Sequence, residues 1–215
     1  MKKAYSIQVE NSAPSQARTA RSVVWAAPLL AGLGAREAVD LGCGRLRNLP
    51  VLEEHFTSVT LVDTEIQCQR VRALLPSRQG IKLVSVDEFR AGNARYDAVF
   101  LIAVLHTVDR PSVRKELLRV AAFKLRPRGF LVLDVPAGEH YYRVRCSKAN
   151  QHGDGWAMGS GPIRTFYKSF NAKALDRLVE RTESFELYER KPIGKHIVRI
   201  WRKLGPARGV VRCAV

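Results

Sequence analysis

The sequence has little of what disulfide-stabilised, metal-binding or membrane-spanning proteins need. Its four cysteines, Cys43, Cys68, Cys146 and Cys213, lie far apart with no CxxC pair, which favours neither a disulfide framework nor a zinc site. Its five histidines form no short i, i+4 pairing with each other or with cysteine, which argues against a metal centre. No run approaches the roughly 18 apolar residues of a membrane span, and the first residues lack the apolar core of a secretory signal. We therefore expect reduced thiols, no metal, no membrane association and a cytoplasmic location.

Acidic residues are also scarce relative to basic ones. The chain of 215 residues has 36 Lys and Arg against 20 Asp and Glu, a formal net charge of +16. Residues 136–215 contribute 16 basic against 7 acidic side chains and so carry more than half of that excess. Such a charge makes an anionic partner plausible: nucleic acid, an anionic membrane face or an acidic substrate. Apolar residues at 46% and charged residues at 26% are ordinary for one globular domain.

Short apolar runs alternate with helix-like segments through the middle of the chain. The strand-like runs are Glu37–Leu41, Ser58–Asp63, Ile81–Ser85, Tyr96–Ile102 and Phe130–Val135. Helices are predicted between them, over about 47–56, from a capping box at Thr64–Gln67 to about Leu75, and from a cap at Asp109 to Leu125. Near-continuous apolar strands separated by amphipathic helices indicate a parallel sheet covered on both faces.

Both ends of the chain depart from this rhythm. Residues 1–35 are predicted to form an N-terminal lead-in segment with a helix over Pro14–Leu33, and residues 36–215 to form the main domain. Residues 136–165 are rich in glycine, aromatic and basic residues without a clear period, so we expect a substrate-binding insertion. Asn171 caps a further helix, and two strands that flank residues 191–195 predict an antiparallel hairpin. The predicted fold is α/β, a single doubly wound, mostly parallel seven-stranded sheet with helices on both faces and a C-terminal antiparallel hairpin.

Glycines and acids follow the predicted strands at the edge where such sheets bind ligands. Gly42 and Gly44 follow the first strand and let the backbone approach a ligand closely, while Asp63 ends the second strand, where a carboxylate can accept hydrogen bonds from both hydroxyls of a ribose. A dinucleotide-binding loop needs a third glycine at position 47, where this chain has Arg47. Asp40, just before the loop, suits an ammonium group and is unfavourable beside a pyrophosphate. An NAD-dependent oxidoreductase is therefore ranked low.

This stretch resembles the class I S-adenosylmethionine-dependent methyltransferases, whose first motif is an acid followed by x-G-x-G-x-G. The resemblance covers about residues 36–203. It implies that Asp40, Gly42 and Gly44 hold the methionine end of S-adenosylmethionine, Asp63 its ribose and Asp87 its adenine amino group. It also implies that residues 103–106 line the methyl-transfer site and that a C-terminal hairpin closes the sheet. The chain departs from the family pattern at Leu46, where most relatives have the third glycine.

Each of these acids also has an ordinary structural interpretation. Asp40 could cap its loop or pair with an arginine, and Asp63 and Asp87 could be turn acids at strand ends. Cys43 is interpreted as a small residue that fits its loop rather than as a reactive thiol.

His106 is the candidate general base, because it follows the fourth predicted strand and its reference pKa lies near neutrality. The alternative is a histidine that packs against the cofactor without moving a proton. Tyr141, Tyr142, Arg143 and Trp156 are the candidate substrate-binding residues of the insertion. Aromatic and cationic residues interleaved in this way suit single-stranded nucleic acid, and equally a lid over a small molecule.

The predicted function is methyl transfer from S-adenosylmethionine to a small molecule or a nucleic acid. The segment Leu101–Val104 lacks the Asp/Asn-Pro-Pro-aromatic sequence typical of enzymes that methylate the exocyclic amines of adenine or cytosine, so that reaction is disfavoured. The alternative is a non-catalytic nucleic-acid-binding or scaffold protein on the same fold. The acceptor atom and the oligomeric state are not encoded in any pattern that we find.

Overall fold

Five runs of buried apolar residues form the parallel part of the main sheet. They are β2 (Glu37–Leu41), β3 (Ser58–Asp63), β4 (Ile81–Ser85), β5 (Tyr96–Ile102) and β6 (Leu125–Pro136). The hairpin strands β10 (Phe185–Ile193) and β11 (His196–Lys203) complete the sheet in the order β10-β11-β6-β5-β2-β3-β4, in which only β11 runs against its neighbours. The predicted doubly wound seven-stranded sheet and its antiparallel hairpin are thus confirmed. The computed structural model describes residues 5–8, 18–75, 79–138, 146, 148–182 and 185–205.

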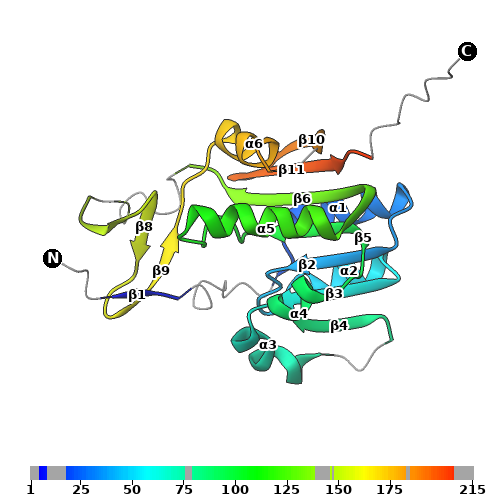
Figure 1. The fold of residues 1–215 in the computed structure, drawn as a ribbon, viewed down its shortest axis with the longest axis horizontal. Coiled ribbons are helices and arrows are strands. Elements are labelled where there is room, and N and C mark those ends of the chain that lie inside the picture. The colour runs from blue at the N-terminus through cyan, green and yellow to red at the C-terminus, as the bar shows by residue number, and fades with distance from the viewer. Residues whose placement is uncertain are drawn as a thin grey trace, which may run out of the picture.

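Helices cover both faces of this sheet, as the strand pattern requires (Figure 1). One face packs against α1 (Arg21–Gly32), α2 (Leu49–His55) and the end of α3 (Glu65–Val71). The other packs against α4 (Val86–Ala91), α5 (Pro111–Lys124) and α6 (Ala172–Glu180). Alternate residues of each strand enter the two apolar clusters, so that Val99 and Leu101 face α5 while Ala98 and Phe100 face α1. Among the helices that the structure describes, none combines the length and the hydropathy of a membrane span.

A second, smaller sheet was not predicted. Within the insertion, β7 (Gln151–His152), β8 (Gly155–Met158) and β9 (Ile163–Tyr167) pair antiparallel after a 3-10 turn, η3 (Lys148–Asn150). The N-terminal strand β1 (Ser6–Ile7) adds to β9 in parallel, with hydrogen bonds from Ser6 N to Pro162 O and from Gln8 N to Arg164 O. This sheet stands beside the main one in Figure 1. Because β1 meets β9 across more than 150 residues of sequence, no local pattern could have indicated the pairing.

Two predicted helix caps are wrong in detail. Asp109 does not cap α5, because the N-cap residue is Arg110, without a side-chain bond, and Pro111 follows at the first helical position. At α3, Thr64 accepts a bond from Gln67 N, but the Gln67 side chain donates to Gly44 O instead of completing the box. α3 also ends at Val71, before a 3-10 turn over Arg72–Leu74 (η2), rather than near Leu75.

The cap predicted at Asn171 is confirmed, since its side chain accepts a hydrogen bond from Ala174 N. The lead-in helix is confirmed over Arg21–Gly32, and its predicted first residues, 14–17, lie outside the described ranges. The helix predicted over 47–56 spans Leu49–His55, with Pro50 in its first turn, where proline is tolerated.

Candidate functional site

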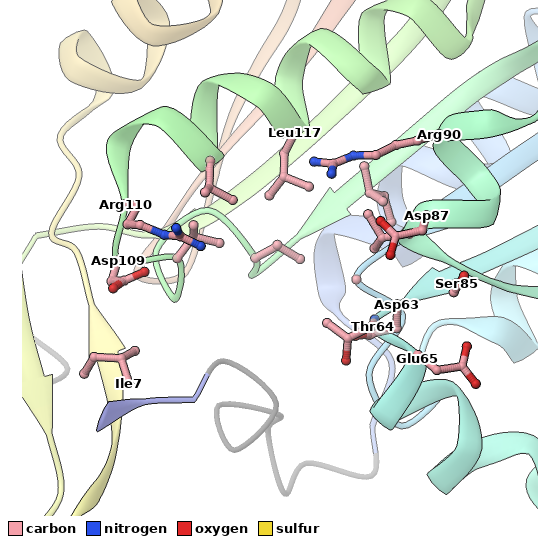
Figure 2. Close-up of a pocket in the computed structure, with 16 residues that line it drawn as sticks. Ile7, Asp63, Thr64, Glu65, Ser85, Asp87, Arg90, Asp109, Arg110 and Leu117 are labelled. Atoms are coloured by element: carbon pink, nitrogen blue, oxygen red, sulfur yellow. The ribbon is translucent and has the colours of Figure 1, made fainter. Parts of the chain in front are cut away.

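The carboxyl ends of four neighbouring strands surround a cavity of about 450 Å³, within the usual range for small-molecule sites. Gly42 follows β2, Asp63 ends β3, and Asp87 follows β4, and all three line it. Figure 2 shows Asp63 and Asp87 on one side of the cavity and Ile7, Asp109 and Arg110 on the other. The cavity therefore lies in the crevice that the strand order predicts, with the small sheet and the start of α5 as its far wall.

Glycine is required at position 42 for two physical reasons. The φ angle of Gly42 is 86°, in the left-handed region, and a Cβ atom there would collide with the side chain of Val104. The loop is held in this close approach by bonds from Gly42 N and Cys43 N to Val62 O, of 2.7 and 3.1 Å. Gly44, with a φ of 55°, is not in the cavity wall, and its N–H donates to Asp63 Oδ2 at 2.8 Å.

Leu46 occupies the position at which the family pattern has its third glycine. It adopts a φ of 63°, the left-handed conformation that glycine adopts readily and that costs another residue roughly 1–2 kcal/mol. Its side chain is buried in the apolar cluster beneath α1 and α2, and this burial offsets the backbone strain. The departure from the family pattern thus preserves the loop geometry.

The carboxylate of Asp63 is fixed by backbone N–H groups at the rim of the cavity. Oδ2 accepts from Gly44 N and Oδ1 from Thr64 N, both at 2.8 Å. Asp87 lies in the first turn of α4, where Ser85 and Glu88 form a complete capping box and satisfy the helix end without it. Both predicted acids therefore face the same cavity from adjacent strands. Acids that merely form turns at the ends of strands would not be expected to converge on one cavity.

Asp40 lies behind the glycine loop rather than in the cavity wall. It is fully buried, and Asn48 Nδ2 donates to its two oxygens at 3.2 and 3.4 Å. Burial raises the pKa of this carboxyl group to about 7, because the charged form loses its hydration. A cationic group beside Asp40 would shift this carboxyl group toward its charged form. The contact of Asp40 with the ammonium group of a ligand stays a prediction.

His106 is likewise buried and absent from the cavity wall. Burial lowers the pKa of its imidazole to about 4, so the ring is neutral at pH 7. Its Nδ1 atom has no hydrogen-bond partner among the residues that the structure describes, and its ring meets Tyr167 edge-on with centroids 5.8 Å apart. Such burial is unfavourable for a protonated ring, and both predicted roles of His106, the base and the contact with the cofactor, stay predictions.

Only one of the four predicted substrate-binding residues is described. Trp156, on β8, is partly buried and stacks on Tyr167, with ring centroids 6.4 Å apart, but it does not line the cavity. Tyr141, Tyr142 and Arg143 lie outside the described residues. Trp156 of β8, Tyr167 of β9 and His106, which follows β5, thus form an aromatic series.

Polar contacts attach the small sheet to the start of α5. Arg114, which is 3% exposed, forms an ion pair with Asp154, and its Nη1 donates to Val108 O at 2.6 Å. His152 Nε2 lies 3.7 Å from the Asp109 carboxylate, which explains why Asp109 is not a cap. The contacts of Asp154 with Arg114 and of His152 with Asp109 were not predicted, nor was the place of Ile7 in the cavity wall, because each joins segments that are distant in sequence.

The cysteines and histidines show no sign of metal chemistry in the described ranges. No group of three or more His, Cys, Asp or Glu side chains there is arranged to hold a metal ion. Cys43, Cys68 and Cys146 are free thiols. Burial raises the pKa of the Cys43 thiol, which keeps it protonated and unreactive.

The fold and the site define a class I methyltransferase architecture, whose cofactor is S-adenosylmethionine. A family described as "Methyltransferase domain" matches residues 17–184, so the chain belongs to that family of enzymes. Comparison with curated protein sequences finds no match.

Several solved structures share this fold at low sequence identity. An S-adenosylmethionine-dependent methyltransferase from Methanosarcina mazei is 18% identical, with a TM-score of 0.64 over 80% of this chain and 94% of that one. The Burkholderia thailandensis 1,6-didemethyltoxoflavin-N1-methyltransferase, with bound 1,6-didemethyltoxoflavin and S-adenosylhomocysteine, is 21% identical, with a TM-score of 0.61 over 85% of this chain and 78% of that one. Human N-acetylserotonin methyltransferase, in complex with S-adenosylmethionine, is 16% identical, with a TM-score of 0.63 over 86% of this chain. This chain spans about half (51%) of that human enzyme.

Proposed function

We propose that this protein transfers the methyl group of S-adenosylmethionine to a small-molecule acceptor. The observation that carries the proposal is the convergence of Gly42, Asp63 and Asp87 on one cavity at the carboxyl edge of the sheet. S-adenosylmethionine supplies a methyl group already activated by its sulfonium. The protein then has to bind the cofactor, align the acceptor and, where the acceptor needs it, accept a proton.

The residues present fit this cofactor along the edge of the sheet. Asp87 is assigned to the adenine amino group and Asp63 to the ribose hydroxyls, because they follow adjacent strands on the same wall. Gly42 lines the cavity directly after β2, so the methionine end is assigned there, with Gly44 shaping the loop and Asp40 behind it. Neutral His106 is assigned to the acceptor side, after β5.

A small acceptor is favoured over a nucleic acid because the cavity is walled on its far side. Ile7 and the start of α5 close that side, and the small sheet brings aromatic rings toward His106. Two of the structural neighbours, those named for N-acetylserotonin and 1,6-didemethyltoxoflavin, are named for small-molecule acceptors. The net charge of +16 is compatible with an acidic small molecule as the acceptor. It is also compatible with nucleic acid, so the labelling experiment below includes a nucleic-acid fraction. A cytoplasmic location is part of the same proposal.

Calorimetry with S-adenosylmethionine tests cofactor binding. Asp63→Ala removes a charged acceptor from two ribose hydroxyls, each bond being worth roughly 1.5–3 kcal/mol, so affinity should fall at least about 10²-fold. Glu54→Ala, which removes a carboxylate from the exposed surface of α2, is the matched control and should bind like the wild type. Because Asp63 also holds Gly44 and Thr64, thermal unfolding must show that the variant remains folded.

A radiolabelled methyl donor identifies the acceptor class. The protein and the labelled donor are added to cell extract, which is then separated into protein, nucleic-acid and low-molecular-weight fractions. Label in the low-molecular-weight fraction is expected. Label in nucleic acid would reject the acceptor class, while binding of the cofactor without any transfer would favour a non-catalytic protein on this fold.

A further inference from the structure

The cavity wall opposite Asp63 and Asp87 carries a guanidinium group among apolar side chains. Arg110, Val113 and Leu117 line the cavity from the start of α5. They are three and four positions apart, the spacing at which side chains share one face of a helix. Figure 2 shows Arg110 extending into the cavity from the side on which Ile7 and Asp109 lie. The fold thus supplies a cationic group and an apolar surface on one side of the cavity.

The charge of Arg110 is not used by the described part of the chain. Its side chain does not cap α5, and no carboxylate among the described residues forms an ion pair with it. Asp109, the acid directly before it, lies 3.7 Å from His152 Nε2 instead. Arg114, one turn further along α5, is by contrast buried in an ion pair with Asp154. The Arg110 guanidinium, which stays charged and offers five N–H donors, is therefore available to a ligand.

The assigned cofactor leaves this wall to the acceptor. Gly42, Asp63 and Asp87 follow β2, β3 and β4, so the cofactor assigned to them lies along the strand ends. Arg90, the second guanidinium in the cavity wall, belongs to α4 and comes three positions after Asp87, on the adenine side. Arg110 comes from the opposite side in Figure 2. Of the two arginines, Arg110 is thus the one placed toward the acceptor.

The charges around the cavity favour an anion beside Arg110. Four acids line the cavity, and three of them lie on the side of the cofactor: Asp63, Glu65 and Asp87. The fourth, Asp109, is held near the imidazole of His152. S-adenosylmethionine adds a net positive charge when it binds, because its sulfonium is not balanced by a second carboxylate. An anion at Arg110 therefore lies beside one cation and across the cavity from another.

We propose that Arg110 is a specificity-determining residue that binds a carboxylate of the methyl acceptor, and that the acceptor is a small molecule with an apolar body. The proposal rests on the proposed methyl transfer. A carboxylate accepts two parallel N–H bonds from a guanidinium, which fixes both its position and its orientation. The apolar body then lies against Val113 and Leu117, with Ile7 on the same side of the cavity. The carboxylate holds the acceptor in place and is not the group that receives the methyl.

The first test uses benzoate and benzamide as probes. The two have the same ring and nearly the same shape, but only benzoate is charged at neutral pH. Their binding to protein saturated with S-adenosylhomocysteine is followed by NMR titration. We expect the wild type to bind benzoate at least about tenfold more tightly than benzamide, and Arg110→Gln to lose this preference. Benzoate that binds no more tightly than benzamide to the wild type would overturn the proposal.

Two further variants make this test specific to Arg110. Arg119→Gln is the matched control, because it removes the same charge from the same helix at a residue that is 61% exposed and does not line the cavity. It should keep the preference for benzoate. Arg110→Lys keeps the charge without the paired donors and should retain part of the preference. Loss of the preference in Arg119→Gln would show that it comes from the net charge of the protein, and the assignment of Arg110 would be wrong.

The second test uses the compound that is labelled in cell extract. Anion-exchange chromatography at neutral pH should retain the labelled low-molecular-weight product, and an unretained product would overturn the proposal. With that compound as the acceptor, Arg110→Gln should raise KM by about 10- to 10²-fold and change kcat less than about threefold. The reason is that the carboxylate is bound alike before and during methyl transfer. An unchanged KM would contradict the assignment.

Calorimetry separates this inference from the proposed function. Arg110→Gln should bind S-adenosylmethionine within about threefold of the wild type, because the cofactor is assigned to the opposite wall. A loss of about tenfold or more would place Arg110 in the cofactor site and overturn this inference, while the methyltransferase proposal would stand. If the wild type does not bind S-adenosylmethionine, the proposed function fails and this inference fails with it. Thermal unfolding of each variant checks that folded proteins are compared.

Discussion

The contact between Gly42 and Val104 yields a prediction whose size follows from the structure. Gly42→Ala places a methyl group at a φ of 86°, which costs an alanine roughly 1–2 kcal/mol of unfolding free energy. The new methyl group would also collide with the Val104 side chain, and such overpacking costs typically about 1–3 kcal/mol. Gly34→Ala is the matched control, because Gly34 has a similar φ of 92° but nothing within 4 Å of an added Cβ.

Thermal unfolding and calorimetry together separate the two costs. Both variants should lose the backbone contribution, and Gly42→Ala should unfold roughly 2–12 °C below Gly34→Ala because it alone carries the collision. Since Val104 lines the cavity, its displacement should also lower S-adenosylmethionine affinity about tenfold or more in Gly42→Ala, while Gly34→Ala binds normally. Equal melting temperatures and equal affinities in the two variants would refute the close approach of the loop to Val104.

Three further predictions concern charge and burial. Because the pKa of Asp40 is raised to about 7 in the folded protein, the unfolded chain releases this proton first; stability should fall by about 4 kcal/mol between pH 4 and 7 and then level off. Urea unfolding of Asp40→Asn should lack this slope, and wild-type S-adenosylmethionine affinity should rise as Asp40 ionises between pH 6 and 7.5. His106→Ala should lower turnover while cofactor affinity stays within about threefold; a large loss of affinity in calorimetry would show a structural role. Asp154→Ala leaves the buried guanidinium of Arg114 without its carboxylate, so the free energy of unfolding in urea should fall by roughly 1–3 kcal/mol. Asp154→Asn should restore part of this loss. An unchanged free energy of unfolding would mean that the ion pair does not hold the small sheet.

The local sequence was sufficient for the main sheet because its strands are buried on both faces. Glu37–Leu41, Ser58–Asp63, Ile81–Ser85 and Tyr96–Ile102 were predicted with the bounds that the structure has, since a run of apolar residues between turns is itself a local signal. The positions of Gly42, Asp63 and Asp87 followed, because residues after parallel strands meet at one edge.

Tertiary structure alone decided the surroundings of the site. The pairing of Ser6–Ile7 with β9, and the contact of Asp109 with His152 in place of a helix cap, join segments separated by at least 40 residues. The same holds for the environment that lowers the pKa of His106.

The sequence by itself determined which strands form and which of their ends carry glycine and acids, because burial of a strand is written in consecutive residues. Only the folded chain decided that Asp134 meets Ser22 and His196, 112 and 62 residues away. The reason is that a hydrogen bond depends on where two side chains meet in space, and the turns and helices between them leave no trace of that meeting in the neighbouring sequence.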